Sequence, residues 1–179
     1  MRYGTLDIIA PGLFGTPCNE AEAIGSAVWL WMHSAVHREA PLHVLPAMLL
    51  PAIRRRQFAF ATEAGKPVFY LSWAWFSEAA EARYVNNLPE RMPEADWSSG
   101  DRLWLLDWVA PFGHTLTLRR VVLRLFADRC MRSLNHRGDQ CGLRVMEFKG
   151  MAVMTEEARA WFLDHPVART PQESGPKKP

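Results

Sequence analysis

Three histidines in the first quarter of the chain have the spacing of zinc ligands. In the segment HSAVHREAPLH, His33, His37 and His43 stand at positions i, i+4 and i+10, and residues four apart share one face of a helix. A zinc protease with this spacing also needs a Glu directly after its first His, to polarise the metal-bound water, and a Gly before the third ligand. Ser34 and Ala40 occupy those two positions here. The sequence therefore predicts no metal site.

A carboxylate lies inside an apolar segment later in the chain. Asp107 is part of LWLLDWV, and burying an ionised carboxylate among such residues is costly unless it is paired. Strand alternation could turn Asp107 toward solvent, or neighbouring amides could bind it. It could also pair with a histidine and set its tautomer and basicity; the candidates are His33, His37, His43 and His114. His37 has one advantage, because the dipole at the end of a helix favours its protonated ring.

The composition is that of one globular domain. The chain has 179 residues, with 21 Lys and Arg against 19 Asp and Glu, which is enough for one core and gives no charge excess that indicates nucleic acid. Cys18, Cys130 and Cys141 are odd in number and have no metal-binding spacing, so no disulfide framework is expected. Because no leader or membrane-length apolar run is visible, we expect a cytoplasmic protein without stable membrane insertion.

The elements that must position these residues are a mixture of helices and strands. Apolar periodicity and turn residues predict helices at 20–37, 78–87, 117–129 and 156–165, and strands at 58–62, 67–76, 102–111 and 142–150. Strict alternation of strand and helix is missing, so the prediction is an α+β fold with a mixed, mainly antiparallel sheet flanked by helices. Residues 1–18 are expected to be an irregular arm, 19–166 a single domain, and 167–179 a disordered tail.

Four segments carry a resemblance to a known family: GSAVWLWMHSAVHRE, LPAIRRRQFAF, PVFYLSWA and WSSGDRLWLLDWVAPFG. They resemble the RTX toxin-activating lysine acyltransferases, the haemolysin-activating proteins of Gram-negative bacteria. The resemblance implies a fold similar to the GCN5-type N-acetyltransferases and transfer of a fatty acyl group from acyl carrier protein to internal lysines of an RTX protoxin. No further cofactor is implied. The family's catalytic His maps onto His37, with Ser34 as the nearby serine, and its catalytic Asp maps onto Asp107.

The chain also departs from the family's pattern. Ala35 stands where family members have Pro, and Glu39 and Ala40 stand where they have Asn-Trp or Asp-Trp, which bears on the acyl pocket and the choice of target. His37 could act as a base toward the lysine amine or first accept the acyl group itself. Acyl length and target lysines do not follow from the sequence, and a homodimer is compatible with it.

Two other functions are compatible with the residues. One is a small-molecule acetyltransferase that uses acyl coenzyme A, but its usual Q/R-x-x-G-x-G/A loop is missing from the sequence. The other is a non-enzymatic chaperone for the toxin, with a hydrophobic platform made of Trp29, Trp31, Trp73, Trp75, Trp104 and Trp108. If the donor is an acidic carrier protein, one of two basic runs could steer it: Arg54–Arg56, or Arg119, Arg120 and Arg124.

Overall fold

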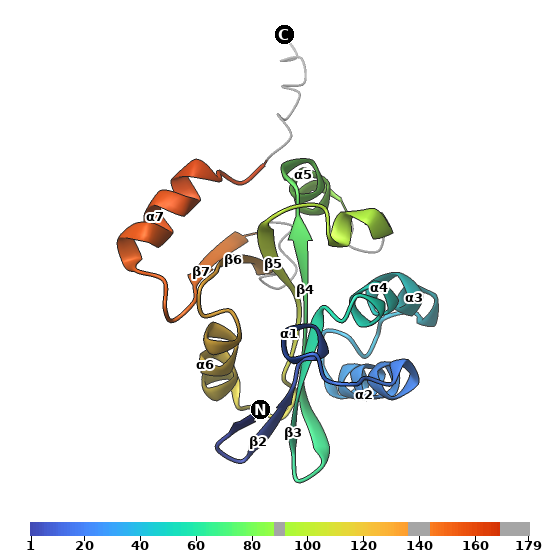
Figure 1. Cartoon of the computed structure of the whole chain (residues 1–179). Helices are drawn as coiled ribbons and strands as arrows, with labels where there is room; N and C mark the ends of the chain where they lie inside the picture. The colour runs from blue at the N-terminus through green and yellow to red at the C-terminus, as the bar shows by residue number, and fades with distance from the viewer. Residues whose placement is uncertain (88–91, 136–143, 169–179) are drawn as a thin grey trace.

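The fold is a single mixed sheet with helices on both faces (Figure 1). The computed structural model describes residues 1–87, 92–135 and 144–168. Within these ranges, seven strands lie side by side in chain order: β1 (Arg2–Tyr3), β2 (Leu6–Ile9), β3 (Phe58–Glu63), β4 (Lys66–Phe76), β5 (Arg102–Val109), β6 (Cys130–Asn135) and β7 (Arg144–Lys149). Neighbouring strands are antiparallel except β5 and β6, which are parallel. The predicted α+β class with a mainly antiparallel sheet is therefore confirmed.

The two faces of the sheet are covered by different helices. One face carries α2 (Glu20–His33), α3 (Leu45–Met48), α4 (Leu50–Arg54) and α5 (Glu78–Asn86), and the other carries α6 (Thr115–Leu125). The remaining helices are α1 (Pro11–Phe14), α7 (Thr155–Asp164) and two 3-10 segments, Leu42–Val44 and Glu94–Trp97. No described helix is long and apolar enough to cross a membrane.

Most of the predicted elements are present. The hairpin of β3 and β4 is antiparallel as expected, and its turn holds Gly65 at φ 79°. The side chain of Asn19 accepts a hydrogen bond of 3.1 Å from the backbone N–H of Glu22, which is the predicted N-cap of α2. The helices at 78–87 and 156–165 are found as α5 and α7, and the strand at 102–111 as β5.

Three regions differ from the prediction. Residues 1–18, expected to be irregular, contain β1, β2 and α1, and β2 pairs with β3. Strand β6 has no counterpart among the predicted strands, and α6 ends at Leu125 instead of 129. The helix α2 ends at His33, because Ser34 has an extended backbone and the chain turns after it. His37 is therefore in a turn and not at a helix end. Cys141 and residues 169–179 of the predicted tail lie outside the described residues.

A buried cluster of charges joins α5 to two strands and to the segment after α7. Glu81 of α5 is fully buried and accepts hydrogen bonds from Arg102, from Arg132 at 2.9 Å and from the indole of Trp104 at 2.8 Å. The backbone N–H of Ala168 donates to the same carboxylate at 2.9 Å. Because one carboxylate serves two buried guanidinium groups, it holds the sheet, α5 and residues 165–168 together.

Replacing Glu81 by glutamine is expected to lower the free energy of unfolding by about 3–5 kcal/mol, because it leaves two buried guanidinium groups without their shared carboxylate. Urea denaturation measures this change. Glu78→Gln is the matched control: its carboxylate also pairs with Arg102, at 3.4 Å, but its side chain is 76% exposed, so a loss within about 0–1 kcal/mol is expected. Equal losses in the two variants would contradict this account.

Candidate active site

A β-bulge in β5 decides where Asp107 points. Leu71 pairs with Trp108 and Trp73 with Leu105, so the single residue Ser72 of β4 faces both Leu106 and Asp107. Such an extra residue interrupts the alternation of side chains along a strand. The sequence alone cannot show it, because neither Gly nor Pro marks the position.

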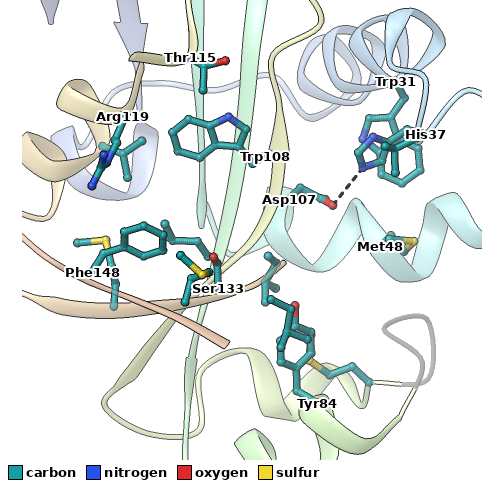
Figure 2. A pocket seen from close by; sticks show the side chains of 18 of the residues that line it. Trp31, His37, Met48, Tyr84, Asp107, Trp108, Thr115, Arg119, Ser133 and Phe148 are labelled. Atoms are coloured by element: carbon teal, nitrogen blue, oxygen red, sulfur yellow. Dashed lines mark ion pairs between the residues drawn. The ribbon is translucent and has the colours of Figure 1, made fainter. Parts of the chain in front are cut away.

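The bulge turns Asp107 away from the core beneath α6. Before the bulge, Leu103 and Leu105 belong to that core, and after it Trp108 packs against the same core. Unbroken alternation would put residue 107 with residues 103 and 105. Since the bulge shifts the pattern by one, Asp107 instead faces the side of the sheet that carries α2 and α4, where His37 lies (Figure 2).

Ser72 holds the Asp107 carboxylate in place. Its hydroxyl donates to Asp107 Oδ2 at 3.3 Å and accepts from the Asp107 backbone N–H at 3.2 Å. Ser72 is fully buried and Asp107 is 8% exposed. The sequence analysis did not single out Ser72, although a lone serine in the apolar strand FYLSWAWF is a signal of the same kind as Asp107. The pair explains how a carboxylate is kept in an apolar strand.

The two ring nitrogens of His37 have different surroundings. Nε2 faces Asp107 Oδ1 at 3.8 Å, which is an ion-pair distance but too long for a hydrogen bond (Figure 2). Nδ1 lies 2.8 Å from the hydroxyl of Ser34. The ring also packs against Trp31, with 4.9 Å between ring centroids. The turn is closed by hydrogen bonds from the backbone N–H groups of His37 and Arg38 to the Ser34 carbonyl, so the turn after α2 brings Ser34, His37 and Asp107 together.

Two of the other candidate histidines, His33 and His114, have partners of their own. The ring of His33 lies 2.8 Å from the Trp29 carbonyl, through Nδ1, and packs against Phe112. His114 pairs with Glu63 at 3.5 Å. His43 is in the 3-10 segment Leu42–Val44. Among the residues that the structure describes, no group of three or more His, Cys, Asp or Glu side chains is placed to hold a metal ion.

A pocket of about 660 Å³ lies next to Asp107 and His37. Its walls are mostly apolar and come from α6, from the ends of β5 to β7 and from the segments around α2 to α5. The lining residues are Trp31, Val36, His37, Ala40, Met48, Tyr84, Met92, Trp97, Leu105, Leu106, Asp107, Trp108, Thr115, Arg119, Val122, Leu123, Met131, Ser133, Leu134, Met146 and Phe148.

The pocket passes through the sheet between β5 and β6. These strands pair only from Leu103 to Leu105, against Met131 to Ser133, and the pocket lies beyond this short ladder. Trp108 and Met131 in its wall belong to the core under α6, whereas Leu106 and Leu134 belong to the cluster on the opposite face. The end of the pairing therefore opens a passage from one face to the other, and Asp107 stands beside it.

The family is decided by comparison with known proteins. A family model described as the RTX toxin acyltransferase family matches residues 16–149 of the chain. The chain belongs to this family. The protein-lysine myristoyltransferase HlyC of Escherichia coli is 37% identical over 144 residues, which cover 80% of this chain and 84% of the relative.

Two other relatives have similar identity to this chain. The protein-lysine palmitoyltransferase CyaC of Bordetella bronchiseptica is 37% identical over 153 residues, 84% of this chain and 82% of the relative. The leukotoxin-activating lysine-acyltransferase LktC of Mannheimia haemolytica, serotype A1, is 34% identical over 140 residues, 78% of this chain and 83% of the relative. These relatives are acyltransferases by name, and the present member of the RTX toxin acyltransferase family is an acyltransferase as well.

Two tyrosines of this acyltransferase lie near the Asp107 carboxylate. Burial is the main reason that the pKa of Tyr70 and of Tyr84 lies above the ordinary value of a phenol, and the negative charge of Asp107 raises both pKa values further. Tyr84 is in the pocket wall, and Figure 2 shows its ring below Asp107. Both phenols are protonated at neutral pH, so neither is available as a base.

The tryptophans do not form the platform that a chaperone would need. Trp73 packs in the core under α6, and Trp104 lies in the cluster on the opposite face. Trp31, Trp73 and Trp104 are at most 3% exposed. The six tryptophans of that hypothesis are therefore divided between separate cores instead of sharing one surface.

Proposed function

We propose that the protein transfers a fatty acyl group from acyl carrier protein to internal lysines of an RTX protoxin, with His37 and Asp107 as the catalytic residues. The observation that supports it most is the pairing of a buried carboxylate with an imidazole nitrogen at the wall of an apolar pocket. The names of the relatives, which are leukotoxin-activating or protein-lysine acyltransferases, agree with the lysine acceptor and the toxin target.

The acceptor needs a base and a negative charge. A lysine side chain has a pKa of about 10.4 and reaches the site as an ammonium group, which is not a nucleophile. The Asp107 carboxylate attracts this cation. If Nδ1 of His37 carries the ring proton and donates it to Ser34, the lone pair of Nε2 faces the pocket beside Asp107 and accepts a proton from the ammonium. Asp107 then stabilises the imidazolium that is formed.

The transfer step follows from this arrangement. The neutral amine attacks the carbonyl carbon of the acyl thioester, a C–N bond forms, and the C–S bond breaks. The thiolate that leaves takes the proton held by the imidazolium of His37, which regenerates the base. The nitrogen then gives up its second proton through His37 to solvent and becomes a neutral amide. The acyl chain lies against the apolar walls, where burial stabilises it by about 0.8 kcal/mol per methylene group.

A second route passes through a covalent intermediate, in which Nε2 of His37 attacks the thioester and carries the acyl group as an acyl-imidazole. The two routes differ when donor is present without acceptor. A covalent route releases one equivalent of carrier thiol per enzyme in a burst and adds the acyl mass to the protein, whereas direct transfer does neither. Rapid quenching followed by mass spectrometry distinguishes them.

The proposed function is tested by incubating the protein with acyl-loaded carrier protein and a protoxin fragment. Mass spectrometry of the fragment is expected to show the acyl mass on internal lysines. Acyl coenzyme A and a set of small amines serve as the alternative donor and acceptors. Transfer only from coenzyme A to small amines, or binding of the fragment without any lysine modification, would overturn the proposal.

A chelator such as EDTA is expected to leave the transfer rate unchanged, because the step uses a side-chain base and no metal-bound water. The comparison needs a protein sample of measured metal content before and after dialysis. Stoichiometric zinc in active protein, lost together with activity, would contradict this expectation.

The free thiols of Cys18 and Cys130 fit a reducing compartment. We place the reaction in the cytoplasm on this ground.

A further inference from the structure

Three exposed arginines of α6 have no carboxylate partner among the described residues. The other exposed arginines without one, Arg2, Arg56, Arg144 and Arg159, lie on four different segments. Five arginines elsewhere in the described residues are within ion-pair distance of an acidic side chain: Arg38, Arg54, Arg55, Arg83 and Arg129. Arg119, Arg120 and Arg124 are all exposed. In the described part of the chain none of the three makes an ion pair, and only Arg124 has a ring contact, with Tyr3 at 6.0 Å. The α6 sequence TLTLRRVVLRL contains no acidic residue.

This charge pattern contributes little to the stability of the helix. Arg120 and Arg124 are four residues apart, and like charges at that spacing destabilise a helix by about 0.2–0.5 kcal/mol. Arg124 is in the last turn, where a cation favours the helix end. Packing is supplied by the opposite side of the helix, through the buried residues Leu118, Val121 and Val122. Among the described residues Arg119 and Arg120 have no ion pair or ring contact, so the fold itself does not use most of this positive surface.

The positive surface adjoins one end of the pocket. Thr115 and Arg119 are in the pocket wall and are exposed. Figure 2 shows the ring of Trp108 between Arg119 and His37. At the His37 end, the wall includes Val36, which is 80% exposed. The pocket is thus reached past α6 on one side and past the turn after α2 on the other, and among the described lining residues the one cationic side chain, Arg119, is on the α6 side.

We propose that Arg119, Arg120 and Arg124 form the docking surface for an acidic protein that delivers the acyl thioester. The proposal rests on the proposed function, in which acyl carrier protein is the donor. Charge complementarity selects this partner, because an acidic carrier is steered to an unpaired positive surface. Arg119 belongs both to that surface and to the pocket wall, so a thioester docked there is next to the pocket. The other basic run is a weaker candidate, since two of its three arginines are paired, Arg54 with Glu20 at 3.6 Å and Arg55 with Glu94 at 2.7 Å. In the described residues only Arg56 of that run has no ion pair.

The test compares two donors: acyl carrier protein, and the same acyl group on N-acetylcysteamine, a small thiol without a protein. The double variant Arg120→Glu/Arg124→Glu is expected to raise KM for the carrier donor by roughly ten- to hundredfold at low ionic strength, because electrostatic steering changes association by such factors. The difference should shrink as salt is added. With the small thioester the double variant should differ from the wild type by less than about twofold, since steering acts only on the acidic protein.

Arg54→Glu is the matched control, because it reverses one charge of the other basic run. It should leave KM for the carrier donor within about twofold of the wild type, because its charge is already paired. Three results would overturn the docking surface. The double variant could lose activity equally with both donors, Arg54→Glu could raise KM for the carrier more than the double variant does, or the double variant could raise KM for the toxin fragment instead of the carrier. If the wild type uses the small thioester but not the carrier protein, it is the proposed donor that fails.

Discussion

Replacing His37 by alanine is expected to abolish measurable acyl transfer while the fold stays intact. A general base contributes roughly 10²–10⁴-fold to a rate, and an acyl-imidazole route would lose its nucleophile altogether. The structural cost is small, because His37 lies in a turn, where its ring interacts with the Ser34 hydroxyl, the Trp31 ring and Asp107. The measurement is the rate of lysine acylation on a protoxin fragment, with circular dichroism to check folding.

His33→Ala is the matched control for this experiment. His33 belongs to the same short segment, and its ring packs against Trp29 and Phe112 away from Asp107. Its loss should leave the transfer rate within about twofold, as surface substitutions away from a site usually do. Near-wild-type transfer by the His37 variant, or equal losses in the two variants, would exclude His37 as base and as nucleophile.

Replacing Asp107 by asparagine should lower the transfer rate on the order of 10²-fold or more, because charge stabilisation in a buried site typically has this size. The substitution keeps the shape of the side chain but removes the charge that, in the proposed mechanism, attracts the lysine ammonium and stabilises the imidazolium. Folding should survive, since a neutral amide is less costly to bury than a carboxylate.

Transfer kinetics, beside a circular dichroism check, test the role of Asp107. Ser72→Ala is the comparison: it removes the hydroxyl that bonds Asp107 Oδ2 at 3.3 Å but keeps the charge. It should lower the rate less than Asp107→Asn does. A folded Asn variant with an unchanged rate would make Asp107 a structural residue and leave His37 without its partner.

The sequence predicts the candidate residues better than their arrangement. Asp107 stands out because a carboxylate in LWLLDWV needs a partner, but the direction of its side chain depends on the bulge opposite Ser72. A bulge depends on how two strands pair, and no local pattern in β5 encodes it. Likewise, the apolar periodicity of α2 continues past His33, whereas the chain turns at Ser34. The turn, not a helix end, presents His37 to the site.

Strand β6 shows a second limit of sequence reasoning. Its sequence CMRSLN contains a fully buried arginine, Arg132, so it lacks the alternation of apolar and polar residues that predicts a half-buried strand. Arg132 is tolerated because Glu81, from a helix 51 residues earlier in the chain, accepts its hydrogen bond. Two residues so far apart in the sequence meet only in the folded chain, so the sequence around Arg132 does not reveal this contact.

The passage between β5 and β6 has a consequence for the order of events in catalysis. Its exposed ends are marked by Arg119 on one side and Val36 on the other, so two separate routes lead to Asp107. If the proposed carrier uses the first route and the toxin the second, spent carrier can dissociate and be replaced while the toxin stays in place. Several lysines of one toxin molecule can then be modified in a single encounter. Partially acylated toxin would be scarce in such a processive reaction, even when toxin is in large excess over enzyme.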